Sequence, residues 1–98
     1  MLTEEMLNAT NLGIINSSDS IVLNMPEEPV AAYFKFTVEE GCILSFYSSS
    51  MSIFYFFDAE GKDLMLNGMG VYTYEFAPGD YYISPMVGAS YDIPLDIT

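Results

Sequence analysis

The stretch Val71–Pro85, with the sequence VYTYEFAPGDYYISP, decides the fold class of this 98-residue chain. Its first half places aromatic side chains at every second position, as a half-buried strand requires, because successive side chains point to opposite faces. The aromatic face consists of Tyr72, Tyr74 and Phe76. The Pro-Gly-Asp sequence at residues 78–80 predicts a turn in which Gly79 takes a positive φ. Alternation then resumes, with Tyr81 and Ile83 on one face. The stretch therefore predicts two strands joined as a hairpin.

The same period of two recurs on both sides of this stretch. Further strands are expected at residues 14–15, 21–23, 32–38, 42–47, 53–57, 64–66 and 91–97. About eight strands at spacings of roughly 8–12 residues, with no helix between them, are typical of an antiparallel sandwich or barrel. We therefore predict a single all-β domain over residues 1–98, an antiparallel β-sandwich of jelly-roll type. Residues 1–13 are expected to form an N-terminal arm with at most a short helical turn.

Two of the expected strands carry information about their place in a sheet. Residues 53–57 are apolar on both faces, which indicates a central strand or one whose outer face is covered. Residues 91–97 contain Pro94, which cannot donate to a ladder, so this strand is expected at an edge or with its outward amide there. An exposed edge of this kind would favour a homo-oligomer.

The charge of the chain is strongly one-sided. Lys35 and Lys62 are its only basic residues, Arg and His are absent, and the formal net charge is -12. Nucleic acid and anionic membrane surfaces require Lys and Arg for binding, so both are excluded as partners. Membrane insertion is not expected either, because the sequence contains no apolar run of sufficient length. A cationic partner, bound calcium, or solubility alone explains the charge better.

The usual catalytic pairings are missing from the sequence. Cys42 is the only cysteine, stands beside Ile43 and Leu44, and is interpreted as a small buried hydrophobe. A nucleophilic Cys or Ser needs a base, and the chain contains no His. Two carboxylates acting together, as in a glycosidase, are the remaining enzymatic alternative. We predict that the chain is not an enzyme.

Four segments in order resemble a known family. They are residues 33–41 (YFKFTVEEG), an aromatic strand ending in Asp58–Gly61, the Tyr72–Tyr74 segment, and residues 76–83 (FAPGDYYI). Together they resemble the bacterial pre-peptidase C-terminal domain, a β-sandwich appended to secreted proteases, and are similar to the collagen-binding modules of clostridial collagenases. The resemblance covers residues 20–87. It departs where the family often has an Asp-rich start to the middle strand, here residues 50–53, and where Ser84–Pro85 replaces a common Arg or Lys. It implies a non-catalytic module that binds a ligand or assists a neighbouring domain.

Two groups of residues are candidates for a binding site. Asp58, Glu60 and Asp63 surround a tight turn at Gly61 and could offer oxygen ligands to Ca²⁺; the alternative is a solvated hairpin turn. The acidic pairs at 27–28 and 39–40 are interpreted as solvated loop charge.

Aromatic residues form the second group of candidates. Tyr33, Tyr47, Tyr55 and Tyr82 fall opposite the faces assigned to the core. Exposed, they could stack on sugar rings or anchor a protein partner; the alternative is that they cover the outer sheet face.

Two functions from different classes follow. The first is a non-catalytic accessory or binding module of a bacterial secreted or cell-surface protein, which binds protein or carbohydrate or acts as a spacer. The second is a standalone acidic inhibitor or nucleic-acid mimic, for example phage-encoded, that blocks a basic surface of another protein. The first implies an extracellular location, and the second a cytoplasmic one if the chain is complete. A mimic should gather its carboxylates on one face, whereas the sequence scatters them over loops.

Overall fold

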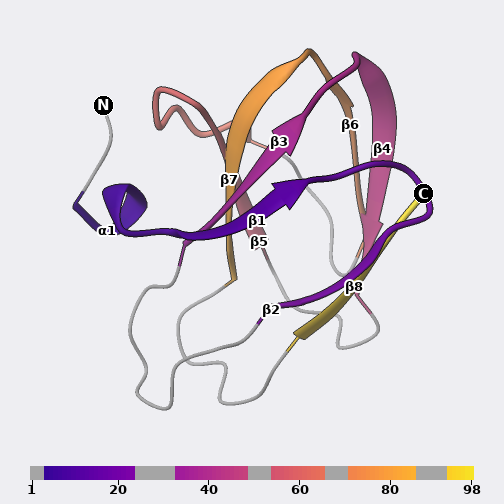
Figure 1. The fold of residues 1–98 in the computed structure, drawn as a ribbon, viewed down its shortest axis with the longest axis horizontal. Coiled ribbons are helices and arrows are strands. Elements are labelled where there is room, and N and C mark those ends of the chain that lie inside the picture. The colour runs from indigo at the N-terminus through magenta and orange to yellow at the C-terminus, as the bar shows by residue number, and fades with distance from the viewer. Residues whose placement is uncertain (1–3, 24–32, 49–53, 66–70, 86–92) are drawn as a thin grey trace.

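The predicted all-β sandwich is confirmed. The computed structural model describes residues 4–23, 33–48, 54–65, 71–85 and 93–98 (Figure 1). It contains one helical turn, α1 (Glu4–Leu7), and eight strands. The strands are β1 (Thr10–Ile14), β2 (Ser20–Leu23), β3 (Phe34–Val38), β4 (Cys42–Tyr47), β5 (Phe54–Asp58), β6 (Val71–Phe76), β7 (Gly79–Pro85) and β8 (Ile93–Ile97). Residues 10–13, expected in an arm, belong to β1.

The strands form two four-stranded layers. Sheet A has the order β1-β3-β7-β5, and sheet B has the order β2-β8-β4-β6. Every pair is antiparallel except β1 with β3, which run parallel side by side (Figure 1). Each described strand therefore lies in the layer opposite to that of the strand before it in the sequence.

The hairpin predicted for Val71–Pro85 is wrong, although both of its strands and its turn exist. Strand β6 pairs with β4 in sheet B, whereas β7 pairs with β3 and β5 in sheet A. The Pro-Gly-Asp turn, with φ of 151° at Gly79, thus carries the chain from one layer to the other. The reason is that both strands have an aromatic inner face, and these faces can meet across the core. The rings of Phe76 and Tyr81 lie 4.9 Å apart, and the Tyr81 hydroxyl donates to the Ala77 carbonyl at 2.6 Å.

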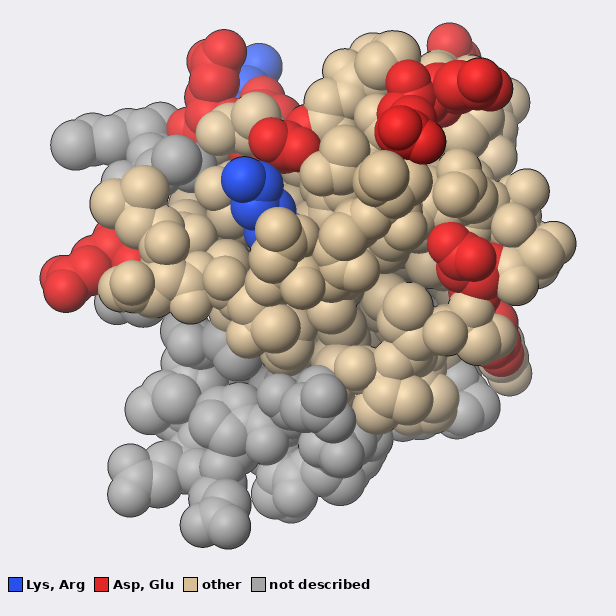
Figure 2. All heavy atoms as spheres, viewed as in Figure 1, with Lys and Arg blue, Asp and Glu red and all other residues tan. Residues whose placement is uncertain are grey.

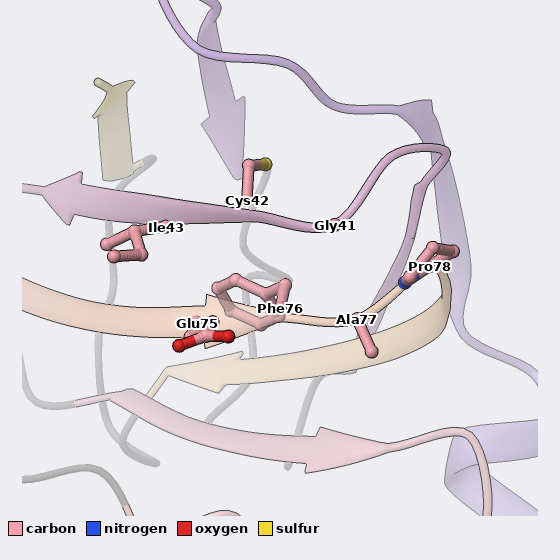
Figure 3. Close-up of a pocket in the computed structure, with 7 residues that line it drawn as sticks. All are labelled: Gly41, Cys42, Ile43, Glu75, Phe76, Ala77 and Pro78. Carbon is pink, nitrogen blue, oxygen red and sulfur yellow. The ribbon is translucent and has the colours of Figure 1, made fainter.

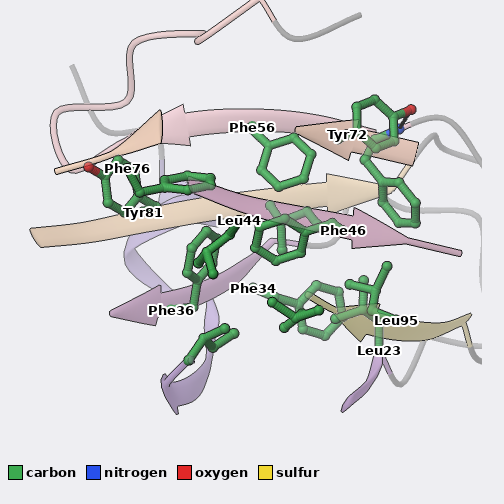
Figure 4. Close-up of a cluster of buried hydrophobic side chains, with 14 of the residues drawn as sticks. Leu23, Phe34, Phe36, Leu44, Phe46, Phe56, Tyr72, Phe76, Tyr81 and Leu95 are labelled. Atoms are coloured by element: carbon green, nitrogen blue, oxygen red, sulfur yellow. Dashed lines mark hydrogen bonds between the residues drawn. The ribbon is translucent and has the colours of Figure 1, made fainter. Parts of the chain in front are cut away.

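The core lies between the layers and is rich in aromatic rings. Phe36 of sheet A contacts Phe46 and Phe76 of sheet B, with centroids 5.6 and 5.8 Å apart (Figure 4). A buried hydrogen bond also joins the layers, because the Phe54 amide donates to the Tyr72 hydroxyl at 2.8 Å. The inner faces predicted from alternation are confirmed. They include Leu44, Phe46, Tyr72, Phe76, Tyr81, Ile83, Ile93, Leu95 and Ile97.

Two predictions of sheet position need correction. Among the described strands, β5 lies at the edge of sheet A rather than at its centre, so its apolar outer face must be explained by a cover. Strand β8 lies between β2 and β4 rather than at an edge. Pro94 is tolerated because the β8 amides alternate: the Ile97 amide donates to Asp19 on the β2 side and the Thr98 amide to Ser45 on the β4 side. By this alternation the Pro94 nitrogen points towards the β4 side of β8. It lies beyond the last described pair between these two strands, which joins Asp96 to Tyr47.

The turn after β5 forms as predicted, but little strand follows it. Gly61 has a φ of 85°, and the Asp58 amide donates to the Lys62 carbonyl at 2.9 Å. Of the strand expected at 64–66, residues 64 and 65 are not in a strand, and residue 66 lies outside the described residues. The only ladder contact described here is the isolated bridge between Phe57 and Asp63.

Candidate binding surface

The centre of the outer face of sheet A is covered by its own side chains, whereas Tyr55 and Ile14 on its two edge strands stay exposed. Tyr82 lies on the inner strand β7, beside Lys35 of β3 and Phe57 of β5, and is only 5 % exposed. The rings of Tyr33 and Phe57 are 5.8 Å apart, although β7 separates their strands. They therefore bridge over β7, which explains why both Tyr82 and its neighbour Ser84 are buried. On β5 the same pair covers part of the apolar outer face, at Phe57, and Tyr55 stays exposed.

Polar groups complete the cover at the other end of β7. Asp80 accepts a hydrogen bond from the Thr37 hydroxyl at 2.7 Å, and its carboxylate lies 3.6 Å from the Lys35 ammonium. The hydrogen bond from Thr37 lowers the pKa of Asp80 against some desolvation, and the charge of Lys35 lowers it further. One of the two basic residues of the chain is thus engaged on this face.

The outer face of sheet B is open. Alternation along its strands sends every second side chain away from the core, and four of these are large and apolar. They are Val22, Ile43, Tyr47 and Val71, with exposed fractions between 48 and 65 %. We call these four residues, with the polar side chains between them, the apolar face. The polar members are Ser20, Ser45, Thr73, Glu75 and Asp96.

Strand register determines how the apolar face is arranged. Tyr47 lies directly opposite Val71 on one side and Asp96 on the other. Next along β4, the hydroxyls of Ser45 and Thr73 lie 2.8 Å apart and satisfy each other, so the centre of the surface holds no charge. Ile43 follows, opposite Glu75. The strip along β4 therefore has an apolar group at each end, two hydroxyls at its centre, and one carboxylate on a neighbouring strand beside each end.

The electrostatics of the apolar face are wholly acidic. The only two basic residues of the chain lie elsewhere, Lys35 in β3 of sheet A and Lys62 in the turn after β5. In the view of Figure 2 the carboxylates lie in separate groups, mostly towards the outline of the molecule, and do not form one continuous band. A cationic group that approaches sheet B would meet no repulsion from its strands.

A shallow hollow continues the apolar face around the end of β4 and β6. Gly41, Cys42, Ile43, Glu75, Phe76, Ala77 and Pro78 line its volume of about 510 Å³ (Figure 3). Cys42 is exposed here, so its predicted burial is wrong. It projects from the side of β4 opposite to Ile43, but at the rim, where the two layers no longer cover it (Figure 3). Among the described residues that line the hollow, Glu75 is the only ionisable side chain apart from Cys42.

The four tyrosines predicted as partner residues do not form one stripe. Tyr82 is buried, and Tyr33 is half-buried against Phe57. Tyr47 and Tyr55 are exposed to nearly the same extent, 48 and 45 %, but they lie on the outer faces of opposite sheets. Of the four, only Tyr47 belongs to the apolar face. Alternation found Tyr47, but it could not reveal the ring pair that covers β7.

Two of the three calcium candidates, Asp58 and Asp63, hold the turn together through their carboxylates. The Asp58 carboxylate accepts the amides of Glu60 and Lys62, each at 2.9 Å, and the Asp63 carboxylate accepts the amide of Met65 at 2.7 Å. The hydrogen bond from the Lys62 amide is the main reason that the pKa of Asp58 is lowered. Within residues 54–65 and the other described ranges, no three acidic or Cys side chains are grouped to hold a metal. Of the acidic pairs, 39–40 is exposed, and 27–28 lies outside the described residues.

Comparison with solved structures identifies a similar fold. The chain is similar to the pre-peptidase C-terminal domain of a collagenase from Bacillus anthracis. The TM-score is 0.50, and the match covers 92 % of this chain and 94 % of that one, with 14 % sequence identity. The resemblance read from the sequence is thus confirmed at the level of the fold. No protein-family model matches the sequence, and no curated protein sequence matches it.

The described part of the chain contains no helix long enough and apolar enough to span a membrane.

Proposed function

We propose that this chain is a non-catalytic accessory module that binds a protein partner through the apolar face. The observation that carries the proposal is the asymmetry of the sandwich. Sheet A covers the centre of its outer face, where Tyr33 and Phe57 meet over the buried Tyr82, and leaves only edge-strand residues such as Tyr55 exposed. Sheet B leaves Ile43, Tyr47 and Val71 exposed. Aromatic and branched side chains on a regular sheet form a rigid contact surface that loses little conformational entropy on binding.

The fold supports an accessory role in an exported bacterial protein. The similar solved structure is a domain of a collagenase, which is a precedent for this sandwich as an appended domain. The lack of His and Arg from the whole chain supports a role without catalysis. A flat surface with one tyrosine favours a protein partner over a carbohydrate, since sugar rings are held by stacked aromatic residues.

Selection from a random peptide library displayed on phage tests the proposal. We expect peptides to be enriched on the wild-type chain and lost on the Tyr47→Ser variant, but retained on the Tyr55→Ser variant. The latter removes a tyrosine of equal exposure from the opposite face. Equal enrichment on Tyr47→Ser would disprove the role of the apolar face. Retention of the chain on an oligosaccharide array, without peptide enrichment, would make carbohydrate the ligand.

The acidic inhibitor is the second candidate, and the net charge of -12 favours it. A mimic of nucleic acid should bind a basic surface through many carboxylates, with an affinity that falls steeply as salt increases. Glu75 and Asp96 are the described carboxylates on the apolar face, and they stand at its ends. The strip between them carries no charge and presents Ile43, Tyr47 and Val71, so we expect loss of one of these apolar side chains to weaken binding more than removal of one charge.

A further inference from the structure

We infer that the partner of the apolar face is a protein surface that presents Lys or Arg beside apolar side chains, and not a second copy of this chain. This inference rests on the proposed function and names the chemistry of its partner. It rests on two observations. The carboxylates of Glu75 and Asp96 flank the strip, and both lysines of the chain lie outside sheet B.

The first step concerns what the surface offers. Tyr47 and Val71 form a directly opposed apolar pair, and Ile43 extends the strip along β4. Burial of these side chains against a partner would remove apolar area from water, the main source of affinity in a protein contact. This part of the surface favours a partner with apolar groups, but it is uncharged and does not discriminate between basic and acidic partners.

The second step concerns the sign of the charge. Glu75 lies opposite Ile43, and Asp96 lies opposite Tyr47 while accepting a hydrogen bond from the Ser20 hydroxyl at 2.9 Å. No strand of sheet B carries a lysine that could neutralise either carboxylate. A partner that covered the strip would bring its own groups against these flanking carboxylates, and cations there would gain Coulomb energy where anions would lose it.

The third step excludes a second copy. A two-fold contact between two apolar faces would bring two copies of Glu75 and two of Asp96 together without a lysine from either sheet B. Each chain also carries a net charge of -12, so their approach is opposed at long range. The negative electrostatic field of the chain would, in contrast, speed its encounter with a basic partner.

The experiment uses three synthetic twelve-residue peptides and the intact chain. One alternates Lys with Leu, one replaces each Lys by Gln, and one replaces each Leu by Ser. Isothermal titration is run on the wild type, on Tyr47→Ser and on the double variant Glu75→Gln/Asp96→Asn. The matched controls are Tyr55→Ser, which removes a tyrosine from sheet A, and Glu4→Gln, which removes a charge from α1.

We expect the Lys/Leu peptide to bind the wild type and both controls with similar affinity. Tyr47→Ser should raise its dissociation constant by about 10-fold or more, as the loss of an aromatic hot-spot contact does. The double carboxylate variant should raise it by roughly 3- to 10-fold, with a smaller effect at high salt. The Lys/Ser peptide should bind at least about 10-fold more weakly than the Lys/Leu peptide, because it lacks the apolar contact.

Several results would overturn the inference in different ways. Equal binding of the Gln/Leu and Lys/Leu peptides, lost in Tyr47→Ser, would leave the proposed binding surface in place and remove the cationic requirement. Equal binding of the Lys/Ser and Lys/Leu peptides, unchanged in Tyr47→Ser, would show general attraction to an acidic protein and remove both proposals. Concentration-dependent dimerisation of the wild type in sedimentation, abolished by Tyr47→Ser, would assign the face to a second copy.

Discussion

The two outer faces of this sandwich begin from similar sequence patterns and end in opposite states. On sheet A, the outward positions of β7 and β5 carry Tyr82, Tyr55 and Phe57, and on sheet B those of β4 and β6 carry Ile43, Tyr47 and Val71. Only the first set has a covered member, Tyr82, over which Tyr33 reaches across β7 to Phe57, while Tyr55 at the sheet edge stays exposed. Sheet B has small hydroxyls in the corresponding central place, Ser45 and Thr73, which bond to each other.

The difference shows that an outward apolar residue is not by itself evidence for binding. A ring on a central strand becomes part of a second, minor core when longer side chains from both neighbouring strands meet above it. A ring flanked by short hydroxyls stays accessible. The sizes of the neighbours decide which outcome a given tyrosine has.

The largest expected effect is a difference in the free energy of unfolding between substitutions on the two outer faces. Tyr82→Ala should lower the free energy of unfolding by about 3 kcal/mol, because it leaves a cavity under the Tyr33–Phe57 pair. Tyr47→Ala should cost less than about 1 kcal/mol, as a substitution at an exposed position does. Urea unfolding monitored by circular dichroism measures both, and Tyr82→Phe, which keeps the ring, is the control. Similar costs at the two positions would abolish the distinction between a covered and an open face.

A smaller effect should arise from the interface that both sheets share. Tyr72→Phe removes the hydroxyl that accepts the Phe54 amide, while both outer faces keep their composition. A buried amide left without its partner costs about 1–3 kcal/mol. Hydrogen exchange should show faster opening of the Phe54 amide, and peptide binding to the apolar face should not change. Loss of binding in this variant would mean that the apolar face depends on the alignment of the two layers.

Much of the sandwich could be predicted from period-two alternation, because every inner face is set by local sequence. Layer membership could not, and the Val71–Pro85 stretch shows why. The same Pro-Gly-Asp turn serves a hairpin or a crossing between layers, and the choice depends on pairing with β3 and β4, which are distant in sequence. The candidate binding surface could likewise be predicted only in part. Alternation places Tyr47 and Tyr82 alike outside the core, and only the contact of Tyr33 with Phe57 distinguishes them.

The smallest expected effect tests the polar part of the cover on sheet A. The pKa of Asp80 is lowered in the folded chain, first by the Thr37 hydroxyl and then by Lys35. The folded state therefore binds protons less readily than the unfolded one, so this contribution is present above the ordinary Asp pKa of about 4 and is lost as pH falls through the lower folded value. Asp80 is partly exposed, at 43 %, so solvent screening keeps the contribution below about 1 kcal/mol.

Unfolding free energies of wild type and Asp80→Asn between pH 2 and 7 measure this contribution directly. The two curves should converge as pH falls below about 4, because protonated Asp80 then resembles Asn. Asp58, whose pKa is also lowered, titrates in both proteins and cancels from the difference. Thr37→Val should reproduce most of the effect while keeping the charge pair with Lys35. A difference that stayed constant with pH would assign the role of Asp80 to turn geometry, and the cover of sheet A would then depend on its aromatic rings alone.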